Sequence, residues 1–373
     1  MTTVAPGAST DQHAKATTTT QGVVGGVDTH ADTHTAAVLD AAGRLLGHQT
    51  FPTTGAGYAA LLAWLRGFGA LLGVGVEGTG AYGAALADHL TAAAVAVVEV
   101  NRPDRAARRA AGKSDPTDAE AAARAVLAGV RTATPKDRTS TRGAQVEALR
   151  VLRVARRGAV DARARAARQL KAVLVTAPSG LREQLTGLSD RVLLATCAAL
   201  DPDTSAAAAG QATAATMISL RALARRHATA AAEVADLDAL IEPLVAAINP
   251  RLLELNGVGA DVAGQLLVTA GANAHRITSE AAFAMTCGVA PLPASSGKTR
   301  RHRLNRGGDR QANAALYRVV LCRMRWDQRT KAYVARRTTE GLSKKEIIRC
   351  LKRIIAREIY YVLQRPHDHA LAA

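Results

Sequence analysis

The chain has 373 residues, a formal net charge of +17 and 48% hydrophobic residues. This length predicts two or three domains with a buried core, and the positive charge predicts a polyanionic partner whose binding releases counterions. Four cysteines without a Cys-x-x-Cys pair argue against a zinc module or a disulfide framework, and no 18-residue uncharged apolar run is long enough to cross a membrane. We therefore expect a cytoplasmic protein that associates with the nucleoid.

The basic residues are concentrated in two blocks. Residues 101–171 hold 18 Lys and Arg against 7 Asp and Glu, and residues 298–365 hold 20 against 5. Aromatic residues make up only 3% of the chain, so contacts to the sugar-phosphate backbone should dominate over base stacking. The two blocks predict two nucleic-acid contact surfaces whose affinity falls steeply with salt.

The first 132 residues predict a tail and an α/β domain. Residues 1–20 are rich in Thr, Ala and Ser and lack the features of a signal peptide, which predicts a disordered tail. In residues 21–132, apolar runs, turn residues and helical periodicity alternate. Strands are predicted at 22–28, 33–39, 44–51, 74–77 and 95–100. Helices are predicted at 55–68, after the Gly-Thr-Gly turn at 78–80 as far as residue 90, and from residue 115 onward. Three strands followed by alternating elements predict a mixed five-stranded sheet flanked by helices, the order of ribonuclease-H-like enzymes of the RuvC type.

Four carboxylates occupy the positions at which that fold carries its acids. Asp28 closes the first predicted strand and Glu77 closes the fourth. Asp115 and Asp118 open the last helix, where residues three apart share a face. Four carboxylates share one pocket at neutral pH only when cations hold them, so the pattern predicts Mg²⁺ as cofactor. The structural alternative is an N-cap at Asp115 with Asp118 closing a capping box.

Residues 133–249 predict a helical connector. The segment 138–175 is rich in Ala and Arg, and an apolar heptad repeat in it is interrupted by Arg153, Arg156 and Arg163. Two interpretations therefore stay open for this helix: a coiled coil, or a solvated basic helix that lies along nucleic acid.

Residues 250–373 predict a mostly helical C-terminal domain. It follows a second long helix at 213–248, whose apolar stripe with three–four spacing predicts packing in a core or a dimer seam. Gly257 and Gly259 belong to a Gly-Val-Gly hairpin between two predicted helices, as in a helix-hairpin-helix motif, where backbone N–H groups can hold a DNA phosphate. A helix–helix corner that requires glycine is an equally good interpretation.

Ser295 and Ser296 lie in a Pro/Gly/Ser loop directly before a dense run of arginines. A serine hydroxyl needs a base, a metal or positive charge to act as a nucleophile, and the basic run provides charge that can clamp a scissile phosphate. Ser-Ser-Gly is also an ordinary turn sequence, so a structural role stays open. The residues predicted to contact nucleic acid are Lys113, Gly257, Gly259, Lys298, Arg300, Arg301, Arg303, Arg306 and Arg310.

Four motifs follow one another in order along the chain. They are Gly-Val-Asp at 26–28, Val-Glu-Gly-Thr-Gly at 76–80, Lys-Ser-Asp-Pro-Thr-Asp-Ala at 113–119, and Gly-Val-Ala-Pro through Ser-Gly to Arg-Gly-Gly-Asp at 288–309. Together they resemble the DEDD-type transposases of the insertion sequence 110 family, relatives of the Piv DNA invertases, over residues 22–365.

The resemblance implies a site-specific recombinase that moves its own insertion element. It implies that Asp28, Glu77, Asp115 and Asp118 are the acid tetrad of a RuvC-like domain, and that Ser296, or its neighbour Ser295, is the nucleophile of the C-terminal transposase domain. It also implies a structured RNA that bridges donor and target DNA. Dimers would pair into tetramers, with the acids of one subunit facing the serine of another.

Two rival functions use the same residues differently. A metal-dependent nuclease such as a junction resolvase would need the acids but not the serines, and a non-enzymatic DNA-binding protein would need neither. A covalent protein–DNA adduct abolished by one serine mutation would exclude both rivals.

Overall fold

The computed structural model describes residues 22–100, 114–130, 132–201, 208–298 and 302–364. The chain divides into two compact units between Lys136 and Asp137. None of the helices formed by the described residues is long and apolar enough to cross a bilayer.

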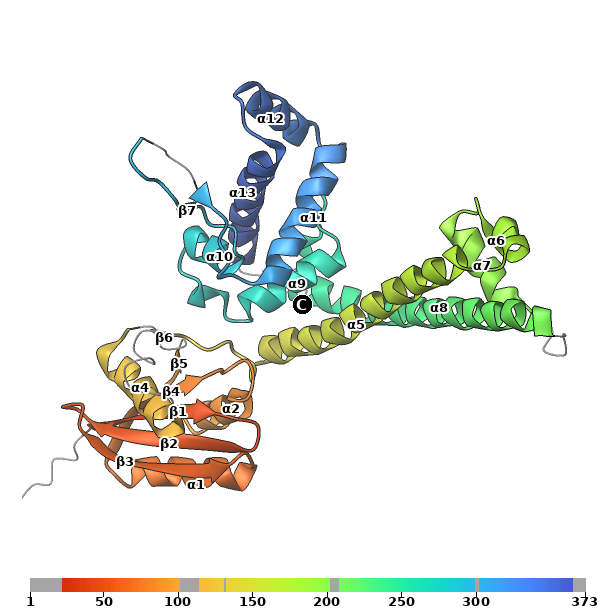
Figure 1. Cartoon of the computed structure of the whole chain (residues 1–373). Coiled ribbons are helices and arrows are strands. Elements are labelled where there is room, and N and C mark those ends of the chain that lie inside the picture. Colours follow the sequence, from red (N-terminus) through yellow and green to blue (C-terminus); the bar gives the residue numbers. More distant parts are fainter. Residues whose placement is uncertain (1–21, 101–113, 131, 202–207, 299–301, 365–373) are drawn as a thin grey trace, which may run out of the picture. The chain divides into compact units, whose positions relative to one another are not determined.

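The N-terminal unit is a mixed sheet with helices on both faces (Figure 1). The strands are β1 (Gly22–Thr29), β2 (Thr33–Asp40), β3 (Leu45–Pro52), β4 (Ala70–Glu77), β5 (Val97–Val100) and β6 (Thr132–Ala133), in the order β3-β2-β1-β4-β5-β6. Strand β4 runs parallel to β1 and β5, and the other neighbours are antiparallel. The predicted ribonuclease-H-like fold is confirmed, but the sheet has six strands where the sequence predicted five. Strand β6 has two residues, too few to show an alternating pattern in the sequence.

The two faces of the sheet are covered by different helices. Helices α1 (Gly55–Arg66) and α2 (Ala84–Ala92) bury their leucines on one face, and α4 (Asp115–Ala128) covers the other. Successive residues of a strand point to opposite faces. In β1, Val23 and Val27 therefore pack with α1 and α2, whereas Val24 packs with Ala123 of α4.

Glycines in the sheet allow α4 to lie directly on the strands. A Cβ added to Gly26 of β1 would overlap the backbone N of Ala123 and the carbonyl O of Ala119. A Cβ on Gly75 of β4 would lie 2.8 Å from the carbonyl O of Ala122. The absence of side chains at these two positions sets the spacing between sheet and helix, and so the position of the first turn of α4.

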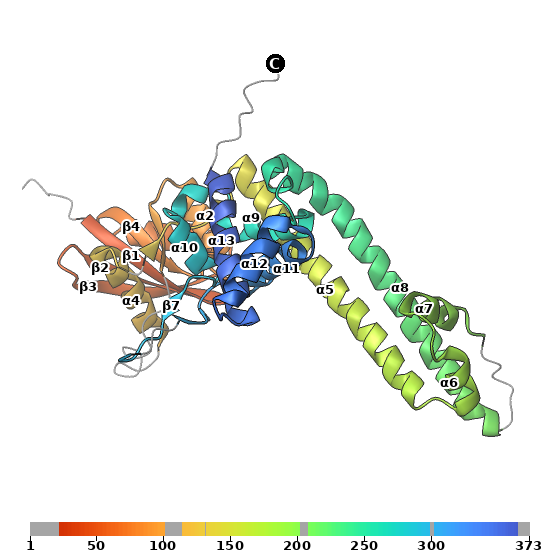
Figure 2. The same cartoon turned by 90° about the horizontal axis from the view of Figure 1, so that it is seen from above.

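The C-terminal unit is helical apart from one small hairpin (Figures 1 and 2). Its elements are α5 (Thr141–Val175), α6 (Ser179–Leu185), α7 (Asp190–Ala199), α8 (Ala208–Ile248), the 3-10 turns η1 (Pro250–Leu252) and η2 (Ala274–Arg276), α9 (Ala260–Ala270), α10 (Glu280–Thr286), β7 (Leu292–Pro293), β8 (His302–Arg303), α11 (Arg310–Trp326), α12 (Gln328–Thr339) and α13 (Lys344–Gln364). The two long helices α5 and α8 lie side by side.

Two apolar clusters stabilise this unit. One joins the end of α5 to α6, α7 and the start of α8 through Leu170, Leu181, Leu193 and Leu220. The larger cluster joins the other ends of α5 and α8 to α9–α13. Ile241 and Ile248 belong to the predicted stripe of α8 and are buried in this larger cluster. These two residues therefore serve the chain's own core.

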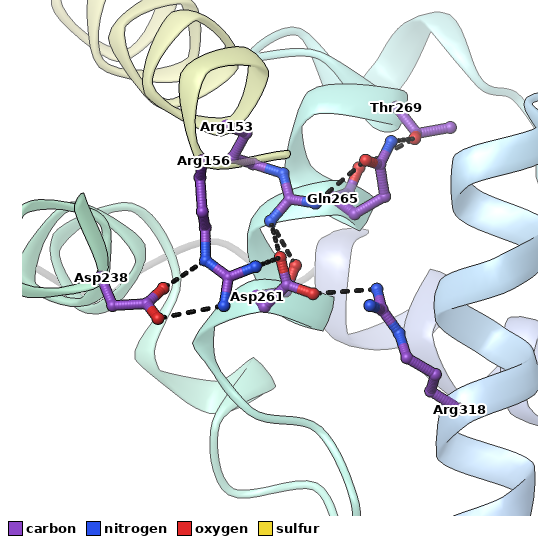
Figure 3. A network of polar contacts seen from close by, with 7 residues as sticks. All are labelled: Arg153, Arg156, Asp238, Asp261, Gln265, Thr269 and Arg318. Carbon is purple, nitrogen blue, oxygen red and sulfur yellow. Dashed lines mark hydrogen bonds and ion pairs between the residues drawn. The ribbon is translucent and has the colours of Figure 1, made fainter. Parts of the chain in front are cut away.

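Arg153 and Arg156, two of the three arginines of α5 that interrupt the heptad repeat, are bonded inside the protein (Figure 3). Arg156 forms an ion pair with Asp238 of α8 and contacts Asp261 of α9 at 3.2 Å. Arg153 donates to the carboxylate of Asp261 at 2.6 Å and to Gln265 at 3.1 Å. Arg318 of α11 contacts the same carboxylate at 2.9 Å. The interpretation of a solvated basic helix is therefore wrong for Arg153 and Arg156, because acids on α8 and α9 neutralise them.

Candidate active site

Asp28 and Glu77 end two neighbouring parallel strands. Val27 pairs with Val76, so Asp28 and Glu77, the next residues of β1 and β4, stand at the same edge of the sheet. They share the sheet face of Gly26 and Gly75, two residues earlier in each strand, and that face carries α4. Thr29 Oγ1 donates a 2.9 Å hydrogen bond to the carbonyl oxygen of Glu77, which ties the two strand ends together.

Asp115 and Asp118 form the first turn of α4, as the sequence predicted. The N-cap is Ser114, so the interpretation of Asp115 as the cap residue is wrong. The hydroxyl of Ser114 lies 2.7 Å from that of Thr117 and makes no capping bond. Asp118 is buried, with 5% of its surface exposed, whereas Asp115 is half-exposed. The positive end of the helix dipole favours both carboxylates.

His30 joins the acids and was not predicted from the sequence. Its Nε2 lies 3.1 Å from Asp28 Oδ2 and 3.4 Å from Asp115 Oδ1. One ligand atom from each of these three residues lies within 4.8 Å of the others. His30 directly follows β1, and its place in the sequence gives no sign that Asp115 lies beside it.

The electrostatics of this cluster suit a cation. Burial raises the pKa of Asp28, and the nearby charges of Asp118 and Asp115 raise it further, while His30 lowers it. A bound divalent cation would remove that repulsion, and carboxylate oxygens are its preferred ligands. The donor set therefore fits a divalent metal, with Asp28 and Asp115 closest to the histidine.

The two serines lie on the β7–β8 hairpin of the C-terminal unit. Leu292 pairs with Arg303 and Pro293 with His302, and Ser295 and Ser296 follow β7 with exposed side chains. An exposed hydroxyl at a hairpin tip is accessible to a large substrate such as DNA.

The predicted nucleic-acid contacts divide into three groups. Lys298, Arg303, Arg306 and Arg310 are exposed around the hairpin and the start of α11. Lys113, Arg300 and Arg301 lie outside the described residues. Gly257 and Gly259 precede α9, but a 3-10 turn stands where the first helix of a helix-hairpin-helix was expected.

Gly257 has the features of a corner glycine. Its φ is +77°, in the left-handed region that favours glycine, and an added Cβ would lie 3.3 Å from Cβ of Cys322 in α11. The first turn of α9 carries Asp261, whose carboxylate is bonded by Arg153, Arg156 and Arg318. The positive φ and the nearby Cys322 agree with the interpretation of Gly257 as a helix–helix corner.

The N-terminal unit has a ribonuclease-H-like sheet, with carboxylates at the ends of β1 and β4 and at the start of α4. This arrangement is that of a domain of the metal-dependent nucleic-acid enzymes. Comparison with known families agrees with this class. Residues 25–177, which include all four acids, match a DEDD-type transposase family, and residues 249–335, which include both serines, match the transposase IS116/IS110/IS902 family. No curated protein matches the chain in a sequence search.

The chain belongs to the IS110 family of transposases, which confirms the family inferred from the four motifs. It is therefore an enzyme of an insertion element that binds, cleaves and rejoins DNA.

Proposed function

We propose that this transposase cuts and rejoins DNA through a covalent phosphoserine intermediate, with Mg²⁺ held by Asp28, Glu77, Asp115 and Asp118. The observation that carries the proposal is the convergence of three acids. Asp28 and Asp115 both contact Nε2 of His30, and the charges of Asp115 and Asp118 act on buried Asp28. Bound Mg²⁺ would supply charge neutralisation at the phosphate and at the leaving oxygen.

The serine hairpin supplies the nucleophile in this proposal. The Oγ of Ser296, or of Ser295, bonds to phosphorus as the bond from phosphorus to the leaving deoxyribose oxygen breaks. The proton lost by the serine is, in net terms, gained by that oxygen. A hydroxyl of a second strand then reverses the step, so the energy of the phosphodiester bond is conserved without ATP. Arg303 of β8 and Arg306, which follows it, are exposed, and in this proposal they neutralise the phosphate.

The decisive experiment is to trap the protein–DNA adduct. Purified protein is incubated with Mg²⁺ and end-labelled DNA that spans an element end, with and without RNA transcribed from the element's non-coding end. The products are separated on denaturing gels. We expect an adduct that needs Mg²⁺ and is lost in Asp118→Asn and in one of Ser296→Ala and Ser295→Ala. Strand cleavage that persists in both serine variants would instead identify a metal-dependent nuclease without serine chemistry.

The same assay tests the proposed RNA. A bridging RNA should be required for adduct formation on both donor and target DNA, and ribonuclease treatment before the DNA is added should abolish it. Equal adduct yields with and without the RNA would contradict an RNA-guided reaction.

A further inference from the structure

A cavity of about 820 Å³ lies at the foot of the serine hairpin, between the hairpin and helices α12 and α13. Its wall includes Gly288–Pro291, which lead into β7, and His302–Asn305, which include β8. The opposite wall comes from α12, α13 and the turn between them. The size of the cavity suits a group such as a nucleotide.

Cations dominate the lining of this cavity. Arg337, Arg349 and Arg353 reach it, although each also forms an ion pair with a glutamate. Glu346 is the one acid among its lining residues, and it accepts hydrogen bonds from the backbone N and the hydroxyl of Ser343. The cavity as a whole therefore favours an anion.

Lys352 lines the same cavity, and it is buried without an acid partner. Only 7% of its surface is exposed, and its Nζ donates a 2.8 Å hydrogen bond to Oδ1 of Asn313. Among the described residues no carboxylate lies within ion-pair distance of this ammonium. Burial lowers the pKa of Lys352, and neighbouring Arg349 lowers it further. An ammonium has three donors, and a buried charge without a counter-charge is costly, so an anion bound there would stabilise it.

Exposed apolar side chains lie beside this charge. Leu304 and Ile354 both line the cavity, and about half of each is exposed. Tyr333 adds an aromatic ring to the wall. A ligand with an anionic group and a flat, largely apolar group would satisfy both parts of the surface.

We propose that this cavity binds one nucleotide of a DNA strand, with its phosphate on Lys352 and its base against Leu304 and Ile354. The inference rests on the proposed function, because it identifies DNA as the nucleic acid held next to the hairpin of the nucleophilic serine. DNA is favoured over RNA because the chain belongs to a family of DNA transposases and DNA is the strand that the serine attacks. Asn313 links this site to the hairpin, since its Nδ2 donates to the carbonyl oxygen of Gly288 at 2.7 Å.

Binding is tested without metal, so that the result does not depend on serine or acid chemistry. The probe is a fluorescein-labelled single-stranded oligodeoxynucleotide of twelve thymidines, followed by fluorescence anisotropy at several salt concentrations. Lys352→Met should weaken binding about tenfold or more, because it removes a charge-assisted hydrogen bond in a buried site. It should also reduce the salt slope by about 0.7, the value for one phosphate of a single strand. Lys331→Met, an exposed lysine of α12 outside the cavity, is the matched control and should change affinity less than twofold.

Three outcomes would overturn the inference. The first is equal loss of affinity in Lys352→Met and Lys331→Met. The second is a Lys352 dependence seen only with the corresponding oligoribonucleotide, which would make the ligand RNA. The third is photocrosslinking of a 5-iodo-deoxyuridine oligonucleotide to wild-type protein only at peptides outside the cavity, a measurement that holds even if Lys352→Met fails to fold. If no serine adduct forms but oligonucleotide binding still depends on Lys352, the result counts against the proposed chemistry and leaves this binding site standing.

Discussion

At the scale of single residues, Gly26 allows the close contact between β1 and α4 on which the geometry of the acid cluster depends. Gly26→Ala inserts a Cβ where α4 already touches β1, at Ala119 and Ala123. The helix must move, and Asp115 and Asp118 at its start must move with it. We expect a loss of about 2–3 kcal/mol of stability, measured by denaturant unfolding, together with loss of Mg²⁺-dependent cleavage.

Gly80→Ala is the matched control for this prediction. Gly80 also lies near the acids, just after Glu77, but a Cβ there meets no atom within 4 Å. The Gly80→Ala variant should cleave DNA like the wild type. Normal activity in Gly26→Ala would show that the spacing between α4 and the sheet does not matter.

The acids were predictable from the sequence, but their neighbour was not. Asp28 and Glu77 ended clear apolar runs, and Asp115 and Asp118 stood around a proline typical of a first helical turn. His30 followed the strand, and a lone histidine there gives no signal until Asp115 is known to fold back beside it. Contacts between distant segments depend on packing, and local patterns do not specify packing.

At the scale of elements, helix α5 contains two glycines with opposite consequences. A Cβ at Gly158 meets nothing within 4 Å, whereas a Cβ at Gly143 would lie 2.8 Å from the backbone carbonyl carbon of Arg138. Gly158→Ala should therefore stabilise the unit by about 0.5–1 kcal/mol through higher helix propensity. Gly143→Ala should destabilise it by about 1–3 kcal/mol through overpacking. Thermal unfolding of the two variants and the wild type measures both changes in stability. A change of melting temperature with the same sign in the two variants would contradict the structure.

The network at Asp261 holds α5, α9 and α11 together (Figure 3). Burial opposes ionisation of Asp261, but the charges of Arg153, Arg318 and Arg156 outweigh it and hold its pKa below the ordinary value of 3.8. Asp261→Asn leaves these arginines without their common acid. We expect a loss of about 2–3 kcal/mol near neutral pH, less than for a fully buried pair because 23% of the side chain is exposed.

The pH dependence of stability distinguishes this network from simple packing. Because the folded-state pKa of Asp261 is depressed, its stabilisation is complete above the unfolded-state pKa and is lost as the pH falls through the folded-state value. The difference between wild type and Asp261→Asn should therefore shrink below about pH 4. Asp236→Asn, at an exposed position of α8, should follow the wild type at every pH. A difference that stays constant from pH 7 to pH 3 would exclude an electrostatic origin.

Element types and most boundaries in the long helices followed from the sequence, because apolar periodicity over 35 or 41 residues is a strong signal. The role of the arginines in α5 did not follow. Whether Arg153 faces solvent, nucleic acid or an aspartate depends on which helix lies opposite, and Asp261 is more than a hundred residues away along the chain. Composition therefore overstated the free positive charge of this helix.

At the scale of the whole molecule, the family resemblance implies that the acids of one subunit face the serine of another, and mixing of variants tests this. Asp118→Asn and Ser296→Ala should each be inactive alone. Mixed before the DNA is added, they should exchange subunits and recover part of the recombination activity, because some pairs then contain an intact acid cluster and an intact serine. Product formation from element-end and target DNA measures the recovery.

The control for this mixing experiment is the double variant Asp118→Asn, Ser296→Ala mixed with wild type. In those mixed pairs every site shared between the two subunits lacks either its acid or its serine, so activity should fall to that of the remaining wild-type pairs. No recovery in the mixture of single variants, together with normal subunit exchange, would place acids and serine in the same chain.

The close contact between β1 and α4 also has a genetic consequence. Every missense change at a glycine codon adds at least one carbon to the side chain, so every amino-acid substitution at Gly26 places atoms against α4. A copy of the element with a missense change at this codon should encode an immobile enzyme even when its acids and serines are intact. The codon for Gly26 thus offers a simple way to recognise decayed copies in a genome.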